Sequence, residues 1–291
     1  MSVKEISDYL HINTKKVYAL VGEGKIPATK VTGKWLFPRK LVDRWLMESS
    51  HGGLLSDRLV VTGSDDALIQ RAVTHMVNEM QGHALISYTN TGTELGLSLL
   101  ARQRADVCGV RWGPAEESAQ RHTSLLRQYP PHKNWVLVRA FEREQGLIVN
   151  PGLLEDPNDI GRVFQNDVRW VMRHESAGAQ RYLRELFSEH RIDPARLRIV
   201  AKVLAEREVA SYLHRDEADV GPGPRSLANE FGLNFISAGW EAYDLALDRG
   251  VFFRSLFQNL VQQLKGPECQ RLAVVFGGYG FDSCGQIVWS A

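Results

Sequence analysis

A group of basic and hydroxyl-bearing side chains near the start of the chain has the chemistry to bind DNA. The candidate contacts are Thr14, Lys15, Lys16, Tyr18, Lys30 and Lys34. Ammonium groups neutralise phosphates, and hydroxyls donate hydrogen bonds to phosphate oxygens. Through Glu48 the chain has nine Lys and Arg against five Asp and Glu, an excess of +4, whereas the whole chain carries only +1. The positive charge is therefore concentrated where phosphate contacts need it.

The residue spacing predicts the elements that position this group. Val3, Ile6 and Leu10 recur at helical intervals, residues 11–13 break the pattern, and Thr14 is expected to be the N-cap of a second helix. The polar, basic start of that helix is typical of a recognition helix, which enters the major groove with its N-terminal residues facing the base edges. Its inner apolar face is expected at positions 17 and 19–21.

Two short strands and a closing helix are predicted next. Segments 28–31 and 34–37 alternate around Thr32-Gly33, which predicts a wing, and apolar residues at 41, 42, 45 and 46 predict a helix that covers it. The opening Val-Lys-Glu-Ile-Ser-Asp-Tyr-Leu and the Gly-Lys-Ile-Pro-Ala turn resemble the winged helix-turn-helix of the excisionase and MerR-like class. This resemblance implies binding to a double-stranded DNA operator. The alternative is a small helical domain that binds protein.

Length and composition place the rest of the chain among ordinary globular proteins. The chain has 291 residues, 44% hydrophobic and 24% charged, enough for one large or two medium α/β domains beyond the first module. No leader precedes the first helix and no apolar run could span a bilayer, so we expect a cytoplasmic protein without a membrane partner. Cys108, Cys269 and Cys284 are expected to be reduced, and the nine scattered His residues indicate no metal site.

Residues 51–53, His-Gly-Gly, are expected to form a linker between a DNA-binding domain at 1–50 and a ligand-sensing domain at 57–291. Beyond them, predicted strands alternate with amphipathic helices across polar turns. Strands are predicted at 59–62, 84–88, 105–110, 170–172, 218–221 and 243–247, and helices at 68–80, 94–102, 180–190 and 253–264, with another helix opening at 208–210. This order favours two α/β lobes that share crossover strands, with ligand-facing loops at the carboxyl ends of parallel strands.

A series of short motifs in this region resembles the type II periplasmic-binding-protein-like domain that is fused to helix-turn-helix modules in bacterial one-component regulators. The motifs are Gly63-Ser64-Asp65, Thr91-Gly92 before a helix, Arg-Glu-Gln-Gly-Leu-Ile-Val-Asn-Pro at 143–151, the loop from Arg173 to Gly178, Glu-Ala-Asp-Val-Gly at 217–221 and Tyr243-Asp244-Leu245. The resemblance covers nearly all of residues 57–285. It implies an α/β chain with an N-terminal winged helix-turn-helix followed by a two-lobed domain of this type.

The relatives include molybdate- and tungstate-binding proteins, which clamp an oxyanion between two lobes. The resemblance thus implies a small-anion effector, such as molybdate or tungstate, and no separate cofactor. Helix N-termini hold anions through backbone N–H groups, and several of the polar turns precede predicted helices. The ligand-binding candidates are Ser64, Thr91, Gly92, Arg173, Ser176, Ala177, Gly178, Val209 and Tyr243.

Arg173 is the first candidate for the anion contact, because it matches the Arg of the Arg-x-Asp-x-Ser-Gly-Thr loop in tungstate-type relatives and a guanidinium binds two oxygens of one anion. The alternative is a surface Arg that pairs with Glu175 or another acidic neighbour. The chain departs from the relatives at Ala177-Gly178-Ala179, where they have Ser-Gly-Thr, and at Gln180, where regulators often have a second Arg. Either backbone amides hold the anion, or the ligand is of another kind.

Two functions follow from these observations. The first is a ligand-responsive transcription regulator that is not an enzyme and acts as a homodimer or higher homo-oligomer, because one small module makes few base contacts. The second is an enzyme or ligand-storage protein with an accessory nucleic-acid-binding module. The sequence contains no convincing nucleophile–base pair, which favours the regulator. Trp240, which follows Gly239, is expected to border a cleft.

Overall fold

The computed structural model describes residues 1–23, 26–50, 58–154, 160–174 and 177–291. The chain divides into two compact units, one of Met1–Asp57 with Gly82–Ala84 and the other of Arg58–Gln81 with Leu85–Ala291. The expected linker at 51–53 and the expected ligand residue Ser176 lie outside the described residues. In the part of the chain that the structure describes, no helix is long and apolar enough to cross a membrane.

The first unit is a helix-turn-helix with a two-stranded wing. Its elements are α1 (Val3–Leu10), α2 (Thr14–Gly22), β1 (Thr29–Val31), β2 (Lys34–Leu36) and α3 (Arg39–Ser50), with β1 and β2 antiparallel. A capping box between Ser2 and Glu5 starts α1, and Ile6, Val17 and Phe37 are fully buried in the small core. The wing and the closing helix are present as predicted, but Leu41, expected on the covering face of that helix, is exposed.

The N-cap prediction for the second helix is wrong by one residue. The side chain of Asn13 accepts a hydrogen bond of 2.8 Å from the Lys16 amide, so Asn13 caps α2 and Thr14 is its first residue. Both residue types cap helices, and Asn is the stronger N-cap of the two. Ala19, expected on the inner face, is exposed.

The second unit consists of one mixed sheet with helices on both faces. Its first part contains β3 (Arg58–Gly63), α4 (Ala67–Met80), β4 (Leu85–Asn90), α5 (Thr93–Ala101), β5 (Val107–Val110), α6 (Ser118–Leu126) and β6 (Trp135–Val149). Its second part contains α7 (Ile160–Val163), β7 (Arg169–Arg173), α8 (Gly178–Glu189), β8 (Arg198–Val203), α9 (Glu206–His214), β9 (Val220–Pro224), α10 (Arg225–Phe231) and β10 (Asn234–Asp248). The chain ends with α11 (Arg249–Phe252), α12 (Ser255–Lys265), α13 (Pro267–Phe276), β11 (Tyr279–Gly280) and β12 (Ile287–Ser290).

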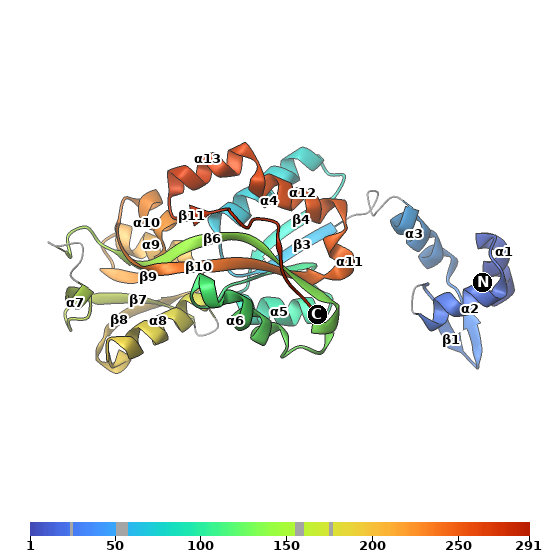
Figure 1. The fold of residues 1–291 in the computed structure, drawn as a ribbon, viewed down its shortest axis with the longest axis horizontal. Helices are drawn as coiled ribbons and strands as arrows, with labels where there is room; N and C mark the ends of the chain where they lie inside the picture. The colour runs from blue at the N-terminus through green and yellow to red at the C-terminus, as the bar shows by residue number, and fades with distance from the viewer. Residues whose placement is uncertain (24–25, 51–57, 155–159, 175–176) are drawn as a thin grey trace. The chain divides into compact units, whose positions relative to one another are not determined.

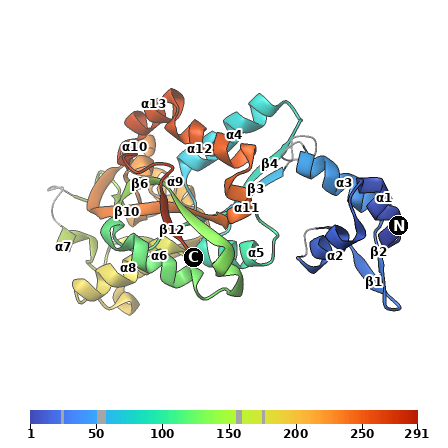
Figure 2. The same ribbon diagram turned by 45° about the vertical axis from the view of Figure 1, so that its right-hand side comes forward.

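The sheet order β4-β3-β5-β10-β6-β9-β7-β8 defines two lobes. Parallel strands β3, β4 and β5 form the first lobe, and β7, β8 and β9 form the second. The long antiparallel strands β6 and β10 run through both lobes and join them (Figure 1). Figure 2 shows α4, α12 and α13 on one face of the sheet and α5, α6 and α8 on the other. The predicted two-lobed α/β fold with crossover strands is confirmed.

Close backbone packing fixes the loop at the end of β3. Gly63 has a φ of +107°, and a Cβ at this residue would lie 2.3 Å from the carbonyl oxygen of Gly109 on the neighbouring strand β5. The backbone turn after Gly63 leads to Asp65, which contacts the second lobe at the Glu206 amide. A glycine is therefore required at position 63 both by the backbone conformation and by the lack of space.

Replacing Gly63 with Ala should destabilise the second unit, because the new methyl group meets backbone atoms of Gly109 and the backbone conformation is strained. We expect the free energy of unfolding in urea to fall by at least about 2 kcal/mol, from overpacking and strain together. Gly152→Ala is the matched control, since the nearest atom to its added Cβ would be 3.6 Å away. Equal stability of the two variants would show that β3 and β5 are not packed as described.

Candidate functional site

The first candidate site is the exposed basic surface of the helix-turn-helix. Thr14, Lys15, Lys16 and Tyr18 are exposed on α2, whereas Val17 faces the core. Lys30 and Lys34 are exposed on the two strands of the wing. The Lys30 ammonium lies 5.7 Å from the centre of the Trp35 ring, which restrains its side chain through a cation–π contact. The structure thus presents all six predicted DNA contacts to solvent.

The second candidate site lies between the two lobes, where the predicted hydroxyl donors are already engaged. The Ser64 and Thr93 hydroxyl oxygens are 2.7 Å apart, and the Ser64 amide donates to the Gly109 carbonyl. The Thr91 hydroxyl accepts from the Gly63 amide and donates to the Gly92 carbonyl. These hydroxyls shape the loops of the first lobe by local side-chain–backbone bonds.

Tyr243 also positions a loop. Its buried hydroxyl donates to the Ser64 carbonyl, to which the Tyr88 hydroxyl donates as well at 2.7 Å. Its ring stacks on Phe141 with the centroids 5.0 Å apart. Burial holds the pKa of Tyr243 well above its ordinary value, so the phenol stays a hydrogen-bond donor. Tyr243 therefore supports the Ser64 loop from the crossover strand.

Three buried arginines and four carboxylates meet between the lobes, and we call them the inter-lobe charge network. Each buried guanidinium comes from a different place, at the end of β5, in the crossover strand β6 and at the end of β7. The members are Arg111, Arg143, Arg173, Asp65, Asp66, Glu206 and Glu241. All three arginines are 1% exposed, which means that their charges must be compensated inside the protein.

Glu206 at the start of α9 connects the second lobe to this network. Its carboxylate accepts hydrogen bonds from Arg111, and from Arg143 at 3.0 Å. Arg143 also donates to Glu241 at 2.8 Å and to Asp66 at 2.8 Å. In the opposite direction, Asp65 of the first lobe accepts a bond of 3.0 Å from the Glu206 amide. The carboxylates of the protein therefore accept hydrogen bonds that a bound anion could otherwise accept from these arginines and amides.

Asp66 and Asp65 each cover a helix N-terminus. The Asp66 side chain accepts from the amides of Leu68 and Ile69 and so caps α4. Asp65 meets the first amide of α9. Since helix N-termini attract negative charge, these carboxylates satisfy three amide groups at the starts of α4 and α9.

Arg173 has more unpaired buried donors than Arg111 or Arg143. Its Nε and Nη1 atoms are buried and have no hydrogen-bond partner within the described residues. Burial lowers the pKa of Arg173, and the nearby charges of Arg111 and Arg143 lower it further against the opposing effect of Glu206 and Asp65. A buried guanidinium with free donors indicates a position for an additional acceptor.

The remaining ligand-binding candidates of the second lobe either lie near Arg111 or point away from the inter-lobe charge network. The start of α8 abuts Arg111, because a Cβ on Gly178 would lie 2.9 Å from the Arg111 carbonyl oxygen. Ala177 is the N-cap of α8, and no side chain caps this helix. Val209 is fully buried in the core beneath α9, so its side chain is structural. The structure brings Arg173, Ala177 and Gly178 to the inter-lobe side and leaves the Val209 side chain out.

Sequence reasoning missed Arg111, Arg143, Asp65, Asp66, Glu206 and Glu241 as members of the site. One signal was available, because Arg111 follows the buried strand β5 just as Arg173 ends β7. The pairing itself joins residues as far apart in the chain as Arg111 and Glu241. Local patterns do not report such pairs.

The charge balance of the network depends on Glu206. Burial alone would raise the pKa of Glu206, but Arg111, Arg143 and Arg173 together lower it to about 2. Burial raises the pKa of Asp65 and of Asp66, although nearby arginines oppose the change. Glu206 is therefore held more firmly in its charged form than Asp65 or Asp66.

Comparison with known proteins agrees with both halves of this description. Residues 1–50 match the model of a helix-turn-helix domain, and residues 75–265 match that of the PBP superfamily domain. The chain belongs to the PBP superfamily. No curated protein matches the sequence. From here we call the second unit the PBP domain.

Solved structures share the fold at low sequence identity. A Clostridium perfringens protein assigned as a phosphate ABC transporter substrate-binding protein, with bound phosphate, is 9% identical, with a TM-score of 0.54 over 77% of this chain and 99% of its own. The CcmR regulatory domain of Synechocystis in complex with 2-PG is 14% identical, with a TM-score of 0.52 over 72% and 95%. An H2O2-bound Corynebacterium glutamicum OxyR mutant is 12% identical, with a TM-score of 0.56 over 94% and 90%.

Replacing Lys15 and Lys16 together with Ala should weaken DNA binding and flatten its salt dependence. Each phosphate contact that is lost reduces the number of counterions released when the protein binds DNA. We expect the log–log slope of affinity against salt to fall by about one unit per lost contact. The measurement is fluorescence anisotropy with operator DNA over a salt series. Lys133→Ala, an exposed lysine in the PBP domain, is the control, and an unchanged slope in the double variant would exclude α2 from the DNA contact.

Replacing Glu206 with Gln should destabilise the PBP domain at neutral pH by about 3–5 kcal/mol, because it leaves buried arginines unpaired. The folded pKa of about 2 lies below the ordinary value of 4.5, so this stabilisation is complete above about pH 5 and declines as the pH falls from 4.5 towards 2. Urea unfolding of both proteins from pH 3 to 7 measures the difference.

The control for this experiment is Glu217→Gln, which removes an exposed carboxylate paired with Arg215 at 2.8 Å in the same lobe. Exposed pairs contribute little, so this change should be small. If the difference in the free energy of unfolding between the wild type and Glu206→Gln stays constant from pH 3 to 7, Glu206 is not charged in the network.

Proposed function

We propose that this protein is a transcription regulator in which the PBP domain binds a small anion and thereby alters DNA binding by the helix-turn-helix. Both matched families are binding domains, which favours a regulator over a catalyst. On this proposal residues 1–50 form the DNA-binding domain and residues 57–291 the ligand-sensing domain.

The observation that carries the anion proposal is Arg173. Its Nε and Nη1 donors are buried between the lobes without a partner among the described residues, and Arg111 has an unpaired Nε in the same network. An oxyanion offers several acceptor atoms and negative charge, which is what free guanidinium donors require. The first turn of α8, with no side-chain cap, lies beside Arg111 and adds backbone N–H groups of the favourable polarity.

Two of the similar structures hold ligands that support this choice. The Clostridium perfringens protein contains phosphate, and the Synechocystis CcmR domain contains 2-PG. Phosphate and phosphorylated small molecules are therefore the first compounds to test. Molybdate and tungstate, which the sequence resemblance implies, are also tetrahedral oxyanions and belong in the same screen.

The anion would exchange with carboxylates of the protein. Asp65 contacts the second lobe at the Glu206 amide, and Glu206 contacts the first lobe at Arg111. Separation of the lobes would break both contacts and free the same donors. Closure of the lobes on an external anion would then give a second state with different inter-lobe contacts. A ligand that binds this state more tightly than the first shifts the equilibrium between them.

The DNA-binding side of the proposal requires two copies of the chain. One helix-turn-helix makes few base contacts, so we propose a homodimer that binds an operator with two half-sites. Light scattering of the purified protein gives its mass in solution. A shift of DNA from the region upstream of its own gene, altered by the anion, tests the regulatory role.

Replacing Arg173 with Met should weaken anion binding without loss of the fold. Met keeps an apolar side chain of similar length, and the loss of the buried Nε and Nη1 donors leaves no hydrogen-bond partner unpaired. We expect affinity for the anion found by the screen to fall about tenfold to a hundredfold, which corresponds to a hydrogen bond with a charged group. Isothermal titration calorimetry measures the affinity, and thermal unfolding without ligand reports the stability.

The control is Arg215→Met, which removes an exposed guanidinium from the same lobe. Ser64→Ala should lower anion affinity less than Arg173→Met, since the Ser64 hydroxyl is already bonded to Thr93. Unchanged affinity in Arg173→Met would remove Arg173 from the site, and a screen in which only uncharged compounds bind would reject the anion proposal.

A further inference from the structure

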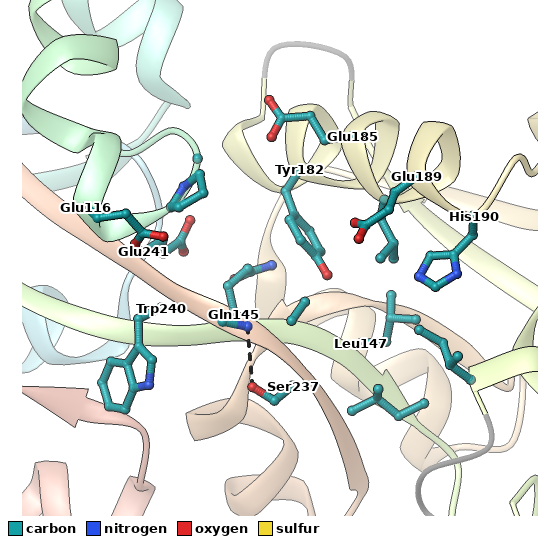
Figure 3. A pocket seen from close by; sticks show the side chains of 17 residues that line it. Glu116, Gln145, Leu147, Tyr182, Glu185, Glu189, His190, Ser237, Trp240 and Glu241 are labelled. Carbon is teal, nitrogen blue, oxygen red and sulfur yellow. Dashed lines mark hydrogen bonds between the residues drawn. The ribbon is translucent and has the colours of Figure 1, made fainter.

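A cavity of about 370 Å³ lies beside the inter-lobe charge network. Its walls are the turn after β5 at Gly113–Glu116, the crossover strands β6 and β10, and the side of α8. It shares Glu241 with the network but none of the three arginines. Figure 3 shows Gln145, Tyr182 and Glu241 directed into this space from three different elements. We call it the acidic cavity.

An irregularity in the sheet forms one side of the acidic cavity. The pairing of β10 with β6 shifts register between Ser237 and Trp240, and Gly239 there has a φ of +115°. Trp240, expected to border a cleft, lies at this rim with 43% of its surface exposed. Bulges of this kind re-aim side chains at functional sites.

Two polar side chains that line the acidic cavity have no hydrogen-bond partner. Both amide atoms of Gln145, Oε1 and Nε2, are unpaired although the residue is only 3% exposed, and the buried Tyr182 hydroxyl is unpaired too. Each buried unpaired group costs about 1–3 kcal/mol, so the fold retains three such atoms at a site where a ligand could pair with them.

The charges around the cavity disfavour anions. Four glutamates line it, at positions 116, 185, 189 and 241, and no Lys or Arg is among the described lining residues. Glu185 is paired with Arg121, and Glu241 with Arg111 and Arg143. The structure gives Glu116 and Glu189 no ion-pair partner among the described residues. The cavity therefore favours a neutral or positively charged ligand.

The remaining lining suits a flat molecule. Leu147, Leu186 and Ile236 provide apolar walls, and the indole of Trp240 provides an aromatic face for stacking. The volume lies within the range of about 300–1,000 Å³ that is usual for small-molecule sites. A glutamine amide presents one donor and one acceptor side by side, which complements the paired donor and acceptor on the edge of a nucleobase.

We propose that the acidic cavity binds a neutral or cationic planar nitrogen heterocycle of the nucleobase class, with its donor–acceptor edge on Gln145. Tyr182 donates to a ring nitrogen or carbonyl, and Trp240 covers one face of the ring. A phosphate attached to the base is disfavoured, because Glu116 and Glu189 lie at the cavity. This site is separate from the anion position at Arg173.

The test is calorimetric titration of the full-length protein with adenine, guanine, cytosine and uracil, and with the 5′-monophosphate of whichever base binds. We expect at least one free base to bind, and its monophosphate to bind at least tenfold more weakly. Gln145→Leu should lower affinity for the base at least tenfold, and it should fold because it replaces a buried unpaired amide with an apolar group of similar size. Tyr182→Phe, which removes only the hydroxyl, should lower affinity as well.

Gln128→Leu, an exposed glutamine in the first lobe, is the control and should keep full affinity. Arg173→Met should also keep affinity for the base, so failure of the anion proposal and failure of this one are distinguishable. Absence of binding by all four bases, tighter binding of the monophosphate, or unchanged affinity in Gln145→Leu would each overturn the proposal.

Discussion

The carboxylate of Glu206 is the constraint on which the arrangement of the two lobes depends. It is 2% exposed, and it belongs to the second lobe while its partners Arg111 and Arg143 belong to the first lobe and to the crossover strand. A buried charge is stable only with compensating charges at hydrogen-bond distance. Neither lobe provides that compensation alone, so closure of the lobes and pairing of these side chains are one event.

Much of the fold could be predicted from the sequence because its information is local. Turn residues and apolar periodicity indicated the helices and wing of the first unit and the alternation from β3 to α9. The strand β8 was missed although its sequence, Arg-Ile-Val-Ala-Lys-Val, is mostly apolar; it lies at the edge of the sheet and most of its residues are exposed. The short strand β11 pairs with β6 inside a glycine-rich segment, where local propensity predicts a turn.

The candidate site was less predictable, since its chemistry is formed by residues distant in the chain. Arg173 could be selected because it matches the Arg of the anion-binding loop in tungstate-type relatives. Ser64 and Thr91 were selected for their hydroxyls, but in the structure those hydroxyls bond to neighbouring loops. Short hydroxyl side chains find local partners easily, whereas the long side chains of Arg and Glu reach between elements. The free donors between the lobes therefore belong to guanidinium groups.

The proposed anion position at Arg173 and the acidic cavity place opposite demands on the ligands that we propose, and Glu241 lies between them. One oxygen of Glu241 accepts from both Arg111 and Arg143, while the side chain also lines the acidic cavity. An anion that drew Arg111 away from Glu241 would leave that carboxylate less neutralised and so favour a donor or cation in the acidic cavity. Because coupling between two binding sites is reciprocal, a base in the acidic cavity would in turn favour the anion at Arg173. On our two proposals, a single shared carboxylate is sufficient to link the two ligands.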